Sequence, residues 1–222
     1  MVVNVSLDNI AGLGAPVTIF GPSRIQTTYS SCAVSPNGRV AYFGRTASHD
    51  PEMRNLVVAP LDASGNVIGI PRCYPTSAWP LAPIGPGGDS YSTITVLLLN
   101  SAKRRLYMGE MREGASTAST PYGLNIYTLD TNGYPTGAVR THAVGKIPAN
   151  GEIHGLLMHP KLPLLYVAVM TGVAVQPLGS EGEPTGEPTV YEMGFGKYSL
   201  DSVRMPNISI WVHSQILWRW LP

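Results

Sequence analysis

The sequence predicts an all-β protein made of repeated four-stranded antiparallel sheets. Three observations predict it: a high content of turn-forming residues, a repeated hairpin pattern, and a second repeated pattern that follows each hairpin. Glycine occurs 24 times and proline 20 times among the 222 residues. Both residue types interrupt helices and favour turns, so this composition argues against a helical bundle.

The first repeat consists of an apolar stretch, a polar turn and a second strand that carries a tyrosine. It aligns without gaps over residues 30–44, 95–109 and 154–168. Each segment predicts a β-hairpin, because two apolar runs flank a short polar turn. The tyrosine recurs as Tyr42, Tyr107 and Tyr166. Recurrence at one position predicts a role in packing the repeats rather than in a single site.

The second repeat follows each hairpin and contains a strand, a leucine, a glycine-containing turn and another strand. It occupies residues 57–71, 125–139 and 174–188, with a shorter version at 4–16. One copy of each repeat makes four antiparallel strands, and such sheets recurring along a chain are typical of β-propeller blades. We therefore predict whole blades over about residues 24–75, 88–144 and 150–193.

The two ends of the chain match the blade pattern only in part. Residues 2–18 predict the outer half of a blade, and residues 197–207 predict one more inner strand. Residues 208–222 hold three of the four tryptophans and lack a blade turn, and their apolar spacing fits a helix and a strand equally. We predict two units: a partial β-propeller at 1–207 and a capping or association segment at 208–222.

The repeats resemble the lactonase-like β-propellers, the 6-phosphogluconolactonase or YVTN-type superfamily. The segments that carry the resemblance are 35–44, 125–137, 159–169 and 175–186. The resemblance covers about residues 4–206 and implies a closed ring with more blades than the three and a half or so in this chain. An open half-ring exposes apolar faces, so we expect a homodimer that closes the ring; a fragment of a longer propeller is the alternative.

Candidate functional residues lie where the predicted inner strands begin, because inner strands line the channel of a propeller. Glu152 and His154 are two residues apart in one strand and therefore face the same side. A carboxylate orients a neighbouring imidazole and raises its basicity, which suits the activation of water. The resemblance also implies that His154 takes the position from which related lactonases direct a histidine into the site. In the alternative interpretation the two residues are a hydrogen-bonded pair that lines a wet channel.

The resemblance, together with the Glu152–His154 pair, predicts a hydrolase that opens lactones or related activated esters, with broad specificity left open. The predicted catalytic residues are His154, Glu152 and Asp89. The predicted residues for binding the small-molecule substrate are Ser30, Thr95, Lys197 and Asp201. The alternative function is a non-catalytic propeller fragment that binds a ligand or a protein. In that case Asp89 only caps its loop. We expect His159 to stabilise its turn.

Other classes of partner and cofactor are not predicted. The sequence has no nucleotide-binding motif and no close His or Cys spacing for zinc, although calcium held by Glu152, Asp89 and Asp201 is left open. A net charge of +1 argues against nucleic acid, and the lack of an 18-residue apolar run argues against a membrane. No signal peptide is visible, which predicts a cytoplasmic location. We expect Cys32 and Cys73 to be buried thiols, with one disulfide left open.

Overall fold

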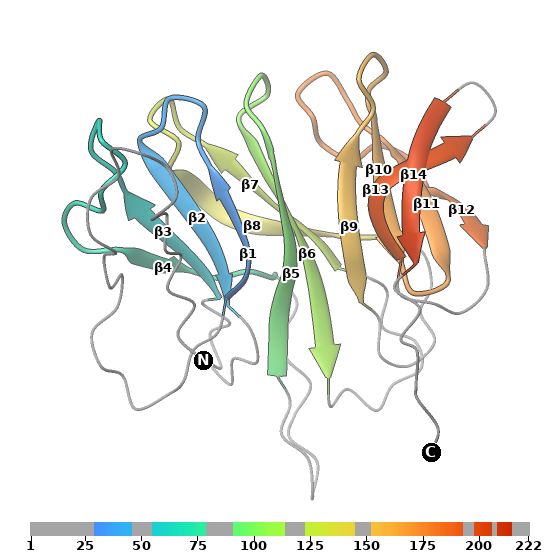
Figure 1. The fold of residues 1–222 in the computed structure, drawn as a ribbon, viewed down its shortest axis with the longest axis horizontal. Helices are drawn as coiled ribbons and strands as arrows, with labels where there is room; N and C mark the ends of the chain where they lie inside the picture. The colour runs from blue at the N-terminus through green and yellow to red at the C-terminus, as the bar shows by residue number, and fades with distance from the viewer. Residues whose placement is uncertain are drawn as a thin grey trace, which may run out of the picture.

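The computed structural model describes residues 29–45, 55–78, 91–113, 123–144, 152–192, 198–205 and 208–214. The fourteen elements found in these residues are all β-strands, which confirms the all-β prediction. Twelve of them form three four-stranded antiparallel sheets that lie side by side (Figure 1). The sheets are consistent with propeller-like blades, and we number them blades 1 to 3 in chain order.

Each blade contains four consecutive strands, and the strands keep their chain order within the sheet. Blade 1 comprises β1 (Tyr29–Val34), β2 (Val40–Arg45), β3 (Leu56–Pro60) and β4 (Arg72–Tyr74). Blade 2 comprises β5 (Tyr91–Asn100), β6 (Arg105–Glu113), β7 (Gly123–Leu129) and β8 (Pro135–Ala143). Blade 3 comprises β9 (Ile153–Met158), β10 (Leu164–Val169), β11 (Gly172–Pro177) and β12 (Thr189–Glu192). These bounds fall within the three blades predicted from the repeats.

A two-stranded antiparallel sheet follows blade 3. It contains β13 (Tyr198–Met205), which corresponds to the inner strand predicted at 197–207, and β14 (Ile208–Ser214). The first half of the tryptophan-rich segment is thus a strand, one of the two alternatives that its spacing allowed. The predicted boundary at 207/208 falls between these paired strands, and capping by residues 208–222 stays a prediction. Residues 2–18 lie outside the described residues.

The second repeat forms a hydrogen-bonded turn. In blade 2, Asp130 Oδ1 accepts the backbone N–H groups of Asn132 and Tyr134, each at 2.8 Å. Asp62 does the same in blade 1, where the N–H of Asn66 contributes most to a pKa of Asp62 below its usual value. The turn then needs a residue with positive φ, which explains its glycine: φ is +94° at Gly133 in blade 2.

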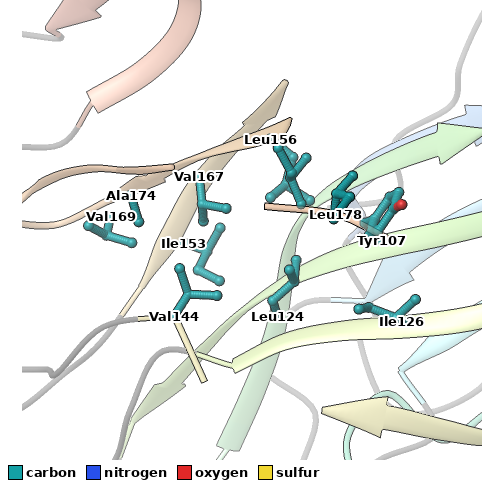
Figure 2. Packing of buried hydrophobic residues seen from close by; sticks show 11 residues of the cluster. Tyr107, Leu124, Ile126, Val144, Ile153, Leu156, Val167, Val169, Ala174 and Leu178 are labelled. Atoms are coloured by element: carbon teal, nitrogen blue, oxygen red, sulfur yellow. The ribbon is translucent and has the colours of Figure 1, made fainter. Parts of the chain in front are cut away.

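The hydrophobic core lies between neighbouring blades. One cluster joins Tyr42, Leu56 and Val58 of blade 1 to the facing side chains of blade 2, among them Ile94 and Leu106. A second cluster joins blade 2 to blade 3, and Figure 2 shows its buried side chains packed between the strands of the two sheets. Strands β5, β6 and β7 of blade 2 therefore pack apolar side chains on both of their faces.

In blades 1 and 2 the repeated tyrosine ties the blade to the next one. Tyr42 donates its hydroxyl hydrogen bond to the carbonyl of Gly133, and Tyr107 donates to the carbonyl of Gly182 at 2.5 Å. The acceptor is in both cases the glycine of the following blade's turn. This geometry confirms the predicted packing role of the tyrosines. Tyr166 is 2% exposed, and its hydroxyl has no hydrogen-bond partner among the described residues.

A small residue on the second strand of each blade lets the next blade approach closely. A Cβ atom at Gly44 would lie 2.7 Å from Ile94 Cγ2, and one at Gly109 would lie 2.6 Å from Ile153 Cγ2. Glycine is therefore required at both positions. Blade 3 carries Ala168 at the equivalent place, where β13 is the neighbouring inner strand.

The expectation that both cysteines are buried is wrong. Cys32 and Cys73 are free and exposed. They lie at opposite edges of blade 1, in a cross-strand row with Phe43 and Val57. Three strand spacings separate their Cα atoms by about 14 Å, which is too far for a disulfide.

Candidate functional site

The inner strands β1, β5, β9 and β13 share one irregularity. In each strand the pairing with its neighbour skips one residue, which is a β-bulge, and β13 has a further irregularity at Val203. The skipped residues are Ser30, Thr95, His154 and Asp201. All four belong to the set of site residues predicted from the sequence, and the structure assigns them one equivalent backbone position. A bulge re-aims the side chain that it carries, so this position is the natural place to examine for function.

In blades 1 and 2 the bulge residue ties one inner strand to the next. Ser30 donates a hydrogen bond to the carbonyl of Ile94, and Thr95 donates one to the carbonyl of Ile153. Each acceptor is the residue just before the bulge of the following inner strand. Their hydroxyl protons are therefore engaged in the structure, whereas the hydroxyl oxygens retain lone pairs that can accept a hydrogen bond. Substrate binding by Ser30 and Thr95 stays a prediction.

In blade 3 the bulge residue is a histidine paired with a carboxylate. His154 Nδ1 lies 3.3 Å from Glu152 Oε1, so the side chains of the bulge residue and of the residue just before β9 are in contact. The side chain of His154 is 10% exposed and that of Glu152 is 13% exposed. A carboxylate accepts hydrogen bonds, so it favours the tautomer with the proton on Nδ1 and leaves the lone pair on Nε2.

The second ring nitrogen of His154 differs from the ring nitrogens of the other histidines with described contacts, although Ser31, Asn55 and Glu183 also have buried polar atoms without a partner among the described residues. His154 Nε2 is buried and has no hydrogen-bond partner among the described residues. The other histidines with described contacts use a ring nitrogen: His142 Nε2 lies 3.0 Å from Gln176 Oε1, and His159 Nδ1 accepts the N–H of Leu162 at 2.7 Å. His159 thus stabilises its turn, as predicted.

Backbone contacts fix the carboxylate of this pair at a blade boundary. Glu152 forms an isolated antiparallel bridge with Met111 of β6, so the residue before β9 is held by the neighbouring blade. His154 itself lies on β9, which has β5 on one side and β13 on the other (Figure 1). The pair is therefore positioned by three consecutive units of the chain.

The remaining predicted site residues are not located in the same detail. Asp89 and Lys197 lie outside the described residues, and Asp201 is placed by its backbone alone. Among the predicted catalytic residues, the structure thus brings together Glu152 and His154. No group of three His, Cys, Asp or Glu side chains within the described ranges is arranged to hold a metal ion.

A second polar cluster was not predicted from the sequence. Glu110, which is 2% exposed, accepts a hydrogen bond from Asn125 Nδ2 at 3.0 Å. Asn125 Oδ1 in turn accepts from Thr141 Oγ1 at 2.6 Å, and Thr141 Oγ1 accepts from the backbone N–H of Ala78 at 2.7 Å. The signal was present in the repeats, because blades 1 and 3 carry valine and alanine at the position of Asn125. The chain of hydrogen bonds connects the segment that follows blade 1 to blade 2.

The fold defines a class: a repeated all-β protein with propeller-like blades. A scan against protein-family models finds no match, and a search of curated proteins finds none either. None of the described residues forms a helix long and apolar enough to cross a membrane. The particular activity therefore has to be argued from the site itself.

Proposed function

We propose that the protein is a hydrolase of lactones or related activated esters and that His154 and Glu152 activate the attacking water. His154 Nε2 takes a proton from water while the water oxygen attacks the carbonyl carbon of the substrate. The acyl C–O bond then breaks, and the proton passes from Nε2 to the leaving oxygen. Glu152 orients the ring and stabilises its protonated form.

One observation carries this proposal: the buried Nε2 atom of His154 has no partner among the described residues, while Nδ1 faces a carboxylate. A buried polar atom without a partner destabilises a fold by about 1–3 kcal/mol. Such a cost is common where a group is needed for chemistry or binding. The equivalent residues Ser30 and Thr95 carry no such cost, because each is hydrogen-bonded to the next inner strand.

The resemblance of the repeats to lactonase-like β-propellers supports the choice of substrate class. Ring closure and membership of that superfamily are part of the proposal, as are cytoplasmic location and the independence of the reaction from a cofactor. Asp89 is proposed as a further acid or base, and Lys197 and Asp201 as substrate-binding groups. The alternative in which Glu152, Asp89 and Asp201 hold calcium is tested by adding EDTA.

The test is a panel of γ- and δ-lactones and aryl esters, assayed with purified protein with and without EDTA. His154→Gln should lower turnover about a hundredfold or more, and Glu152→Gln should lower it less and change the pH profile. The matched control is His159→Asn, which removes an imidazole but keeps an acceptor for the turn at residues 159–164. Turnover that survives in folded His154→Gln protein would exclude the proposed mechanism.

A second candidate, a non-catalytic scaffold that pairs with another copy, is favoured by a different observation. The face of blade 3 that lies away from blade 2 is followed by a sheet of only two described strands. The Tyr166 hydroxyl also lacks, among the described residues, the glycine acceptor that Tyr42 and Tyr107 have. We propose a homodimer at this end of the array. Light scattering after size exclusion should give twice the chain mass at micromolar concentration. A monomer at all concentrations would exclude the dimer.

A further inference from the structure

A groove of about 540 Å³ lies between blades 1 and 2, and its lining residues do not overlap with the site on β9. One wall comes from blade 1 and includes Val58, Ile70 and Arg72, and the opposite wall comes from the turn of blade 2 and includes Asp130 and Tyr134. Its volume falls within the range of small-molecule sites.

The groove results from a difference between the outer strands of the two blades. In blade 2, β8 pairs with β7 directly after the turn, through Leu129↔Pro135 and Thr128↔Thr136. In blade 1 the turn ends with a single bridge, Leu61↔Val67, and pairing resumes only at Val58↔Arg72. The Ile68 N–H still donates to the carbonyl of Pro60 at 2.9 Å, but the residues between Ile68 and Arg72 leave the sheet beside the groove.

The groove combines apolar side chains with polar groups on its surface. Val58 and Pro60 line the blade 1 side, and Ile70 is 87% exposed beside them. The phenol groups of Tyr74 and Tyr134 complete the lining. Large apolar side chains exposed next to a concave surface favour an occupant with an apolar body, preferably a ring that can stack on the tyrosines.

The two charged side chains in the groove differ in whether they already have hydrogen-bond partners. Asp130 on the blade 2 wall already accepts two backbone N–H groups of its own turn. Arg72 on the blade 1 wall makes no hydrogen bond or ion pair with the described residues. The guanidinium therefore has free N–H donors, which suit the planar oxygens of a carboxylate.

We propose that this groove binds a small aromatic carboxylate. The ring lies against Ile70, Tyr74 and Tyr134, and the carboxylate binds Arg72 on the blade 1 side, away from the charge of Asp130. The site is separate from Glu152 and His154 and does not depend on the hydrolase proposal. Its occupant would bridge blades 1 and 2.

The probe is 3-phenylpropionate, titrated into the full chain at low salt and followed by calorimetry. Neutral 3-phenylpropionamide, titrated in the same way, is the comparison ligand. The acid should bind more tightly than the amide. Arg72→Gln should weaken binding of the acid about two- to fivefold, the range for one exposed charge pair. Asp130→Asn keeps the acceptor oxygen for the turn and should strengthen binding, because it removes a like charge. Ile70→Ser should weaken binding of the acid and of the amide.

The matched control is Arg140→Gln, an exposed arginine on β8 that does not line the groove. It should leave the affinity of the acid unchanged. Equal binding of acid and amide, or equal effects of Arg72→Gln and Arg140→Gln, would overturn the carboxylate assignment. No detectable binding of 3-phenylpropionate to the wild-type chain would overturn the site. Lactone turnover should be the same in Arg72→Gln and wild-type protein, which keeps this test apart from that of His154.

Discussion

The interfaces between blades 1 and 2 and between blades 2 and 3, called joints below, differ from the boundary between blade 3 and the two-stranded sheet. Each joint uses the same three devices: a tyrosine bonded to a turn glycine, a glycine that permits close approach, and a bulge hydroxyl bonded to the next inner strand. At the boundary the same three positions hold Tyr166, Ala168 and His154. Among the described residues, neither Tyr166 nor His154 makes the bond that its equivalents make.

This difference shows how a repeat can supply a site. The backbone position is the same in every blade, because the bulge recurs in all four inner strands. What changes is whether the side chain is used to hold the next blade. Where it is not used, as at His154, a reactive nitrogen is available in a preorganised place.

The largest expected effect comes from filling the close contact at a joint. Gly109→Ala would place a Cβ atom 2.6 Å from both Ile153 Cγ2 and Val96 Cγ1. Overpacking of this kind costs about 1–3 kcal/mol, so the free energy of unfolding in urea should fall by that amount. The opposite change at the boundary, Ala168→Gly, should cost about 0.5–1 kcal/mol. Equal stability of Gly109→Ala and wild type would show that this joint is loosely packed.

A smaller effect is expected from the tyrosine hydroxyls. Tyr107→Phe removes the hydrogen bond to Gly182 and should lower the free energy of unfolding by about 0.5–1.5 kcal/mol. Tyr166→Phe should leave it nearly unchanged, because that hydroxyl has no partner among the described residues. Thermal unfolding followed by circular dichroism measures both. A larger loss for Tyr166→Phe than for Tyr107→Phe would contradict the comparison.

The smallest effect is expected from alkaline pH near 10, where tyrosines only begin to ionise. Burial raises the pKa of Tyr127 to about 12 and also raises the pKa values of Tyr42 and Tyr107 above 10. A folded pKa above the unfolded value means that the stabilisation is complete below pH 10 and is lost as pH rises toward 12. Urea midpoints at pH 9, 10 and 10.5 should therefore decrease. The double variant Tyr42→Phe/Tyr107→Phe should show a shallower decrease, and an identical slope would argue against ionisation at the joints.

The repeats allowed the blades to be predicted, because strand and turn patterns depend on local sequence. The tyrosine at Tyr42 and Tyr107 was correctly assigned to packing on repetition alone. The bulge was not predictable, because a skipped residue depends on pairing with the neighbouring strand. For the same reason Ser30 and Thr95 could be predicted only as substrate-binding residues, whereas the structure shows that both tie one inner strand to the next. The unpaired nitrogen of His154, predicted as catalytic, was likewise not visible in the sequence. The groove at Arg72 was missed because it depends on where β4 resumes pairing.

The tyrosine ties also constrain the order in which the nascent chain can fold. Tyr42 and its acceptor Gly133 are 91 residues apart, and Tyr107 and Gly182 are 75 residues apart. Ribosomes add about 5–20 residues per second, so Gly133 is synthesised roughly 5–18 s after Tyr42. Blade 1 can form its sheet during that interval, but it cannot complete the joint. Synthesis therefore imposes a direction on assembly, in which each blade is secured only when the outer turn of the next one has left the ribosome.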